Sequence, residues 1–182
     1  MKKIITSVII SFMAFSTYGT EVSMANDNIE YCSLEVPDIG SYFKSYMDYR
    51  CITNANSPQY TYIRNNGWCD SNGFMRESRD NGINDDYYMI ALGSYYGTSI
   101  GTKYRITTNT GRIFYGVLCD TKSNVHTNPT NQYNTINNNI VEFIVDTRKL
   151  NSYVKKIGSA NVYMPLNGTV SKIERIDFWK EC

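Results

Sequence analysis

Short apolar segments separated by polar turns dominate the second half of the chain. Residues 89–92 and 140–145 are mostly apolar over four to six positions, which predicts buried strands. Residues 103–108 and 112–118 lie on either side of an Asn-Thr-Gly turn at 109–111, and this arrangement predicts an antiparallel hairpin. The pattern therefore favours a protein built mainly from β-strands.

The remaining C-terminal pattern fits the same class of fold. Residues 147–157 predict a short helix that ends at Gly158, and residues 162–164 and 168–178 predict strands that complete the sheet. Short strands with glycine turns, without an alternation of strands and helices, are typical of an antiparallel β-barrel. We expect residues 60–182 to form one small barrel domain.

The first half of the mature chain shows a different spacing. After Pro37, apolar residues recur at steps of three and four, which predicts an amphipathic helix over residues 38–49. The positions that form this stripe are Ile39, Tyr42, Phe43, Tyr46 and Met47. We interpret residues 37–59 as a helical flank packed across the open side of the barrel. Residues 60–68 alternate loosely and predict a strand.

The N-terminus is typical of a secretory signal peptide. Lys2 and Lys3 precede an apolar segment at 4–15, and Ser-Met-Ala at 23–25 is a suitable cleavage site. We expect residues 1–25 to be removed, residues 26–36 to be a flexible arm, and the mature protein to be secreted or associated with the cell wall. The apolar segment is shorter than the roughly 20 residues that span a membrane, so we expect no stable membrane span after cleavage, and an uncleaved anchor is the alternative.

The amino-acid composition and net charge indicate which kinds of binding partner to expect. A net charge of +1 and a pI near 7.5 give no electrostatic reason to expect a nucleic-acid partner. The 16 tyrosines and many asparagines suit carbohydrate contact, although an AT-rich genome produces the same bias. We expect no cofactor.

Five cysteines leave at least one without a partner in the same chain. Cys51 with Cys69 is the first pairing to test, and no Cys-x-x-Cys spacing indicates a metal site. Cys119 lies in a predicted buried strand, where a small apolar side chain is a better interpretation than a nucleophile.

Candidate chemistry gathers around the long loop at residues 121–139. Asp120 ends a predicted strand directly before the loop, and Lys122 and the only histidine, His126, follow it. Loops of this length in compact domains are commonly functional.

Several segments resemble a family of uncharacterised exported proteins of Gram-positive bacteria. Over residues 42–173 they include Ile-Ala-Leu-Gly at 90–93, Asp-x-Lys at 120–122 and Val-Glu-Phe-Ile-Val-Asp at 141–146. More remotely, the core resembles the double-psi β-barrel of the three-aspartate domain and of rare lipoprotein A. The middle aspartate corresponds to Asp120, whereas Gly93 and Glu142 stand at the first and third aspartate positions.

The resemblance to this barrel implies that peptidoglycan or another cell-wall glycan is the partner. Some relatives are similar to lytic transglycosylases, in which one carboxyl group protonates the glycosidic oxygen. Asp120 is then the expected catalytic acid and Glu142 a second carboxyl, which is also the arrangement for glycoside hydrolysis. The expected substrate-binding residues are Tyr95, Tyr96, Lys122 and His126.

Each of these residues also has a structural interpretation. Asp120 is suited to capping the turn that follows it, and Glu142 to pairing with a lysine at the sheet surface. Lys122 is suited to an ion pair with Asp120, and a lone histidine without companion ligands is a poor metal site. Tyr95 and Tyr96 are neighbours, so we expect one of them to be buried.

Three functions therefore remain open from the sequence. The first is a wall-remodelling enzyme that cleaves peptidoglycan glycan strands through Asp120. The second is a non-catalytic glycan-binding module, which is the role of this barrel in expansin-like proteins. The third is a structural or protein-interaction domain whose contact is the loop at 121–139.

Overall fold

The computed structural model describes residues 30–39, 42–78 and 86–177, so the predicted signal peptide lies outside the described residues. The described chain forms nine strands and two α-helices, joined in part by short 3-10 turns. The strands are β1 (Glu30–Leu34), β2 (Phe43–Asp48), β3 (Trp68–Cys69), β4 (Met75–Glu77), β5 (Tyr87–Leu92), β6 (Lys103–Thr108), β7 (Ile113–Thr121), β8 (Asn139–Val145) and β9 (Val170–Asp177), and the helices are α1 (Pro58–Asn66) and α2 (Ser152–Ile157).

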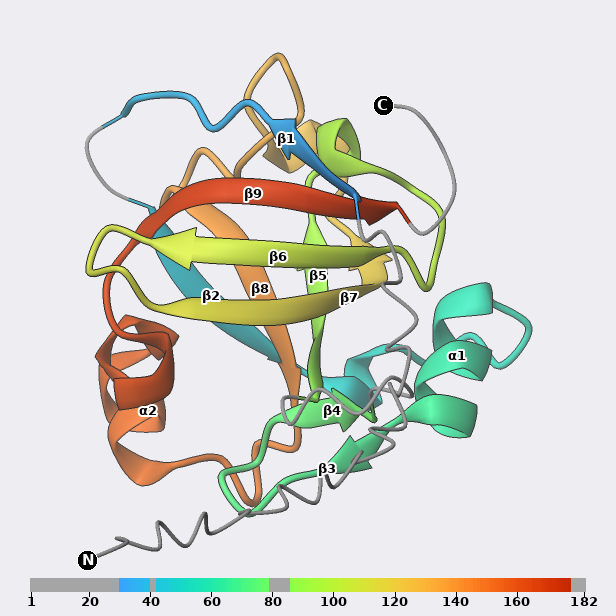
Figure 1. Ribbon diagram of the computed structural model, residues 1–182. Coiled ribbons are helices and arrows are strands. Elements are labelled where there is room, and N and C mark those ends of the chain that lie inside the picture. Colours follow the sequence, from blue (N-terminus) through green and yellow to red (C-terminus); the bar gives the residue numbers. More distant parts are fainter. Residues whose placement is uncertain (1–29, 40–41, 79–85, 178–182) are drawn as a thin grey trace, which may run out of the picture.

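All nine strands belong to one mixed sheet. Its main path is β1-β9-β6-β7-β5-β4-β3, and β8 joins it by pairing with β5 and, on its other side, with β2. The pairs β5–β7 and β2–β8 are parallel, and the other pairs are antiparallel. Strands β6, β7 and β9 run across β2, β5 and β8 (Figure 1). The fold is mainly β as predicted, but the sheet formed by the described strands is not closed.

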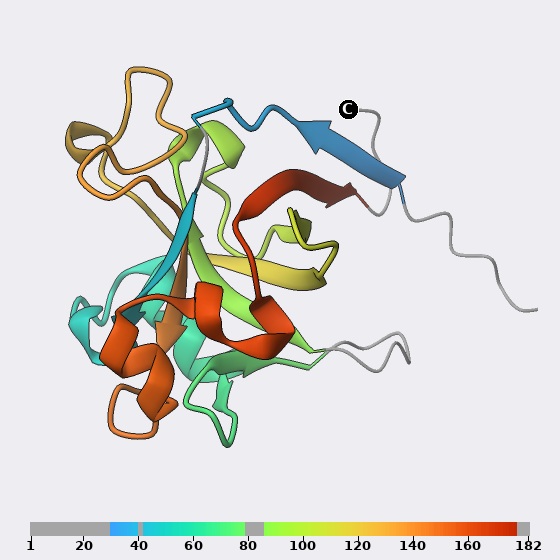
Figure 2. The same ribbon diagram turned by 90° about the vertical axis from the view of Figure 1, so that its left-hand side faces the viewer.

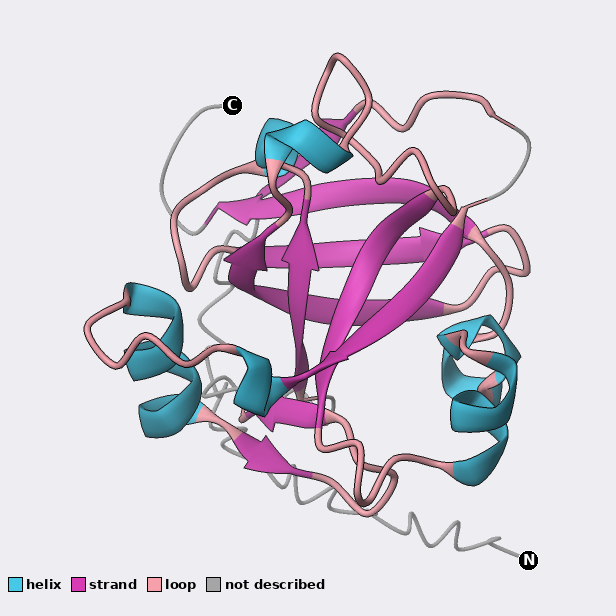
Figure 3. Cartoon of the chain, turned by 180° about the vertical axis from the view of Figure 1, so that it is seen from behind, coloured by secondary structure: helices cyan, strands magenta, loops and turns pink. Residues whose placement is uncertain are grey.

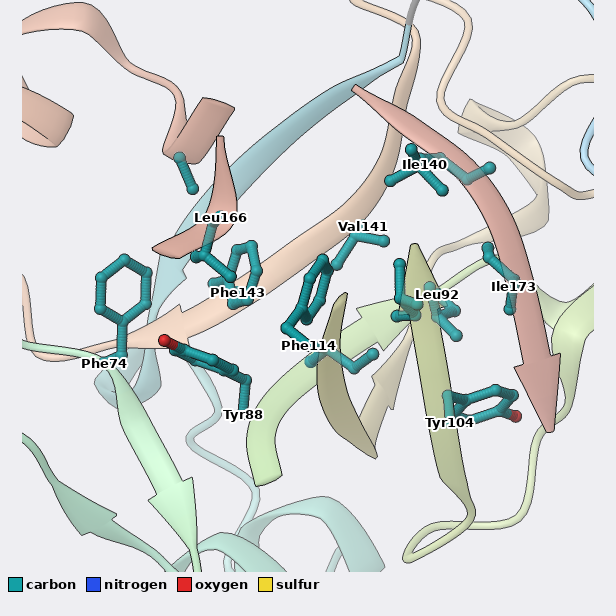
Figure 4. Close-up of a cluster of buried hydrophobic side chains, with 14 of the residues drawn as sticks. Phe74, Tyr88, Leu92, Tyr104, Phe114, Ile140, Val141, Phe143, Leu166 and Ile173 are labelled. Atoms are coloured by element: carbon teal, nitrogen blue, oxygen red, sulfur yellow. The ribbon is translucent and has the colours of Figure 1, made fainter. Parts of the chain in front are cut away.

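Strand β5 lies at the centre of the sheet, and both of its faces are buried. Tyr88, Ile90 and Leu92 point into the larger apolar cluster, and Met89 and Ala91 belong to a smaller cluster on the opposite face. A strand buried on both sides is expected to be apolar throughout, as this one is. The larger cluster is rich in edge-to-face aromatic contacts, such as that between Phe74 and Phe143 at 5.4 Å (Figure 4). These contacts fix the strands on which the candidate site lies.

Most of the predicted strands of the second half are confirmed. The hairpin forms β6 and β7, with Gly111 at a φ of 79° in the turn, where glycine carries no side-chain penalty. The apolar segments at 89–92 and 140–145 lie in β5 and β8, and residues 168–178 include β9. The predicted short helix is α2, which ends at Gly158 with a left-handed φ of 75°.

The amphipathic helix predicted over residues 38–49 is wrong, because this segment contains strand β2. The apolar stripe was read at helical spacing, yet β2 places Tyr46 against the larger cluster and Met47 against the smaller one. A strand that is buried on both faces has apolar residues at adjacent positions, so its sequence also fits the three- and four-residue spacing of a helix. Parallel pairing of β2 with β8 and the β-propensity of the aromatic residues favour the strand.

The strand predicted over residues 60–68 is also wrong, because α1 occupies most of that segment. Ser57 caps this helix by accepting a hydrogen bond from the Tyr60 backbone at 3.2 Å, and Pro58 follows at the first helical position. Gly67 then ends the helix. The N-terminal helix of this protein therefore lies about twenty residues later than predicted.

Two smaller differences involve the edges of the sheet. Residues 162–164 form 3-10 turns rather than a strand. Residues 30–34 of the expected flexible arm form β1, which pairs antiparallel with β9. The long connection between β7 and β8 projects from one end of the molecule, away from α2 (Figure 2), and α1 and α2 lie at opposite sides (Figure 3).

The cysteines differ from the proposed pairing. Cys51 and Cys69 are free thiols, so the suggested bridge between them is wrong, and Cys32 is disulfide-bonded. Cys119 is fully buried, which confirms its predicted place in the core. Burial raises the pKa of its thiol well above the ordinary range, and this leaves the protonated, unreactive form.

Candidate functional site

A row of aligned residues crosses four neighbouring strands and carries both predicted carboxyl groups. Ala91 of β5 pairs with Asp120 of β7 on one side and with Glu142 of β8 on the other. Glu142 pairs in turn with Ser45 of β2. Residues opposite one another on paired strands point to the same face, so the sheet brings Asp120 and Glu142 to one side, separated by the small side chain of Ala91.

A β-bulge places Asp120 in this row. Ile90 pairs with Leu118, but the next residue, Ala91, pairs with Asp120, so Cys119 is the extra residue on β7. A bulge of this kind redirects the side chain that follows it and is common beside functional sites. Without it, Cys119 rather than Asp120 would stand opposite Ala91.

Partial burial changes the acidity of Asp120. Loss of solvent raises its pKa above the ordinary aspartate value, and the nearby negative charge of Glu142 acts in the same direction. Hydrogen bonds from the Thr121 backbone at 2.9 Å and from the Gln59 side chain, together with the charge of Lys122, oppose this rise. The net result is a carboxyl group that holds its proton to higher pH than a solvated aspartate.

Glu142 is held by a buried cation. The Lys122 Nζ lies 3.4 Å from Glu142 Oε2, and the lysine side chain is only 5% exposed. Burial lowers the pKa of Lys122, whereas the charges of Glu142 and Asp120 raise it. The predicted alternative that Glu142 pairs with a lysine therefore holds, but this lysine is buried, and its ion pair is with Glu142 rather than with Asp120.

Sequence reasoning missed three polar residues of this site. Ser45 Oγ donates to Glu142 Oε1 at 3.3 Å and accepts a hydrogen bond from the Asn139 amide. Gln59, in the first turn of α1, reaches Asp120. The cap at Ser57 and Pro58 was a local signal for the helix that carries Gln59, whereas Ser45 and Asn139 meet only through pairing of strands β2 and β8.

The two predicted sugar-contacting tyrosines have different environments. Tyr96 is 1% exposed and belongs to the larger cluster, so its assignment to substrate binding is wrong. Tyr95 is 41% exposed, and its backbone amide donates to the carbonyl of Asn131 in the long loop at 3.2 Å. One of the two is therefore buried, as predicted, and only Tyr95 presents a ring to a ligand.

His126 lies on the surface of the long loop. It ends a short 3-10 turn, and its backbone amide donates to the Ser123 carbonyl. Its side chain is exposed, in agreement with a solvated loop residue. Within residues 30–39, 42–78 and 86–177, no group of three or more potential ligands is arranged to hold a metal ion.

Gly93 follows β5 at a position where a side chain would clash with the long loop. A Cβ atom at Gly93 would lie 2.0 Å from the carbonyl oxygen of Asn131 and 2.9 Å from that of Gln132. The long loop therefore packs directly against the end of β5, and no side chain fits there. This contact also holds Tyr95 beside the loop.

Asp120 and Glu142 are both half-buried. A cleft of about 290 Å³ lies near the end of α1 that is farther from Asp120, and neither carboxyl group lines it. No family model, curated protein or solved structure matches the chain. Among the described residues, no helix is both long and apolar enough to cross a membrane.

Proposed function

We propose that this chain is an exported, cell-wall-associated protein that cleaves peptidoglycan glycan strands by acid catalysis through Asp120. The observation that carries the proposal is the pair formed by Asp120 and Glu142 on one face of the sheet. Desolvation favours the protonated form of Asp120, and Lys122 provides Glu142 with a cationic partner. Unequal environments for two neighbouring carboxyl groups are the usual arrangement for acid catalysis on sugars.

The proposed reaction is that of a lytic transglycosylase. Asp120 donates its proton to the glycosidic oxygen as the bond from that oxygen to the anomeric carbon breaks. The resulting carboxylate then accepts the proton of the C6 hydroxyl, whose oxygen bonds to the anomeric carbon. Glu142 stabilises the positive charge that develops on the sugar ring. The products are one chain with an anhydro end and one with a free hydroxyl.

Three residues are proposed to position the glycan. The exposed ring of Tyr95 offers a face on which a sugar stacks. Lys122, beside both carboxyl groups, and His126, on the adjoining loop, are proposed to bind polar groups of the substrate.

We also propose that the sheet is a double-psi β-barrel of the three-aspartate type. Strands β5, β6, β7 and β8 follow one another in the order of the motifs that resemble the three-aspartate barrel. This order supports assignment to that family of double-psi barrels, and the bulge before Asp120 is consistent with a site at the family's middle aspartate. Secretion follows from the signal peptide expected at residues 1–25.

A non-catalytic glycan-binding module is the second candidate. The observation that favours it is that the half-buried carboxyl groups of Asp120 and Glu142 can accept hydrogen bonds from a glycan without cleaving it. Co-sedimentation of the mature chain with purified peptidoglycan, followed by analysis of the supernatant, separates the two functions. Cleavage releases soluble fragments, and their release requires Asp120. A binding module sediments with the glycan and releases none.

A further inference from the structure

The cleft near the C-terminal end of α1 has a lining that the proposed cleavage at Asp120 does not use. It has a volume of about 290 Å³ and lies among α1, strand β3 and the turn that follows β8. Its lining includes the cations Arg64, Arg148 and Lys149 and the aromatic residues Tyr49 and Trp68. Ligand sites commonly begin near this size, at about 300 Å³, so the cleft suits a single ring rather than a long chain.

The charges of the lining leave an excess of positive charge. Asp146 is buried and accepts two hydrogen bonds from the Arg148 guanidinium, at 2.9 and 2.7 Å, so this acid neutralises Arg148. Arg64 and Lys149 form no ion pair with any residue that the structure describes. Two unneutralised cations at one concave surface attract an anionic group.

The wall of the cleft is held in place before any ligand binds. Besides its pair with Asp146, Arg148 donates to the Tyr49 hydroxyl at 3.4 Å. The Asp48 carboxylate accepts from the Thr147 backbone at 2.9 Å and from its hydroxyl, which fixes the turn that carries Arg148 and Lys149. The backbone that carries Lys149 is therefore fixed, which lowers the conformational entropy lost when an anion binds.

Aromatic surface adds a second recognition element. Trp68 is 42% exposed, and Arg64 lies 5.0 Å from the centre of the Tyr49 ring. Exposed aromatic faces beside cationic groups complement a sugar ring, which has apolar faces and, when acidic, a charged substituent. We propose that this cleft binds a sugar that carries an anionic group, either a carboxylate or a phosphate.

This binding site is independent of the chemistry at Asp120, although α1 connects the two. Gln59 in the first turn of α1 contacts Asp120, and Arg64, five residues further on, lines the cleft. A helix rises about 1.5 Å per residue, so these positions are roughly 8 Å apart along its axis.

Trp68 provides a direct readout of binding. The experiment follows its fluorescence in a Trp179→Phe variant of the mature chain, so that Trp68 is the only tryptophan. N-acetylmuramic acid is compared with N-acetylglucosamine, which lacks the carboxylate, and glucose 6-phosphate with glucose. We expect a saturable response to at least one of the two anionic sugars and about tenfold weaker binding of its neutral counterpart. The anionic sugar that binds identifies the anion.

Charge-removing variants test the assigned residues. Arg64→Ala with Lys149→Ala is expected to weaken the anionic sugar at least about tenfold, since each lost contact is charge-assisted. Arg112→Ala with Lys156→Ala removes the same charge from the surface elsewhere and should leave binding unchanged, as should Asp120→Asn. Equal binding of charged and neutral sugars, no saturable response to either acid, or equal effects of the two double variants would overturn the proposal.

Discussion

Asp120 and Glu142 flank the same residue, Ala91, from two different strands, and this relationship defines the candidate site. Neighbouring strands are about 4.8 Å apart, so the two backbones are separated by roughly 10 Å. Both side chains leave the sheet on the same face. We propose that a glycan lies along this row, beside the two carboxyl groups.

The charges around Asp120 predict opposite effects of two substitutions on activity. Acid catalysis requires protonated Asp120, so activity should fall as the pH rises through the pKa of this group. Glu142 raises that pKa and Lys122 lowers it. Glu142→Gln should therefore move the falling limb of the pH–rate profile to lower pH, and Lys122→Met should move it to higher pH.

The measurement is the initial rate of release of soluble fragments across the pH range for the wild type and both variants. A shift in the same direction for both substitutions would contradict the assignment of Asp120 as the acid. Unchanged limbs with reduced rates would show that a different group controls the profile.

The buried lysine of β2 predicts a pH dependence of stability. Lys44 is fully buried, its amino group donates to Asn161 Oδ1 at 2.8 Å, and burial lowers its pKa to about 7. Above pH 7 the folded state carries the neutral amine, whereas the unfolded chain stays protonated up to about pH 10.5. The unfolded state then binds more protons, so the contribution of Lys44 to stability rises with pH and is smallest below pH 7.

Urea unfolding between pH 7.0 and 8.5 tests this behaviour against Lys44→Met. The free energy of unfolding of the wild type should rise relative to the variant by up to about 1.4 kcal/mol per pH unit. The range stops below the ordinary pKa of the Cys119 thiol, whose burial acts in the opposite direction at higher pH. Parallel pH profiles for the two proteins would contradict a neutral buried lysine.

The contact between β5 and the long loop predicts the effect of filling Gly93. In Gly93→Ala the new methyl group collides with the Asn131 carbonyl, and relief of such a clash costs about 1–3 kcal/mol. The loop should also exchange its amide hydrogens faster, because its packing against β5 is lost. Unfolding in urea and hydrogen exchange at Asn131 measure the two effects.

Gly111→Ala is the matched control for this substitution. A Cβ atom there meets nothing within 4 Å, so only the positive φ of 79° opposes it, at a cost of about 1–2 kcal/mol. Hydrogen exchange in the long loop should stay unchanged in this control. Faster loop exchange in both variants would mean that Gly93 has no special contact with the loop.

Local patterns predicted strands that are joined by a short turn and strands that are buried on both faces. The hairpin of β6 and β7 and the apolar strand β5 are examples. The prediction for the segment around β2 was wrong because its apolar residues fit both helix and strand spacing. Pairing with β8, almost one hundred residues away, favours the strand. The helix α1 was missed although its cap, Ser57 and Pro58, is a recognisable signal.

The candidate site was predictable only in part for the same reason. Asp120 and Lys122 are close in sequence and stood out on one loop. Ser45 and Gln59 join them only because β2 pairs with β8 and α1 packs beside β7, and neither contact leaves a local pattern. The burial of Tyr96 rather than Tyr95 likewise depends on the three-dimensional core.

Catalysis by Asp120 is tested by digesting purified peptidoglycan with the mature chain and analysing the soluble muropeptides by mass spectrometry. Asp120→Asn keeps the size of the side chain and removes the acid, so it is the matched control. We expect fragments with anhydro ends from the wild type and none from the variant, with equal sedimentation of both proteins on the glycan. Release of the same fragments by both proteins, or by neither, would contradict catalysis by Asp120.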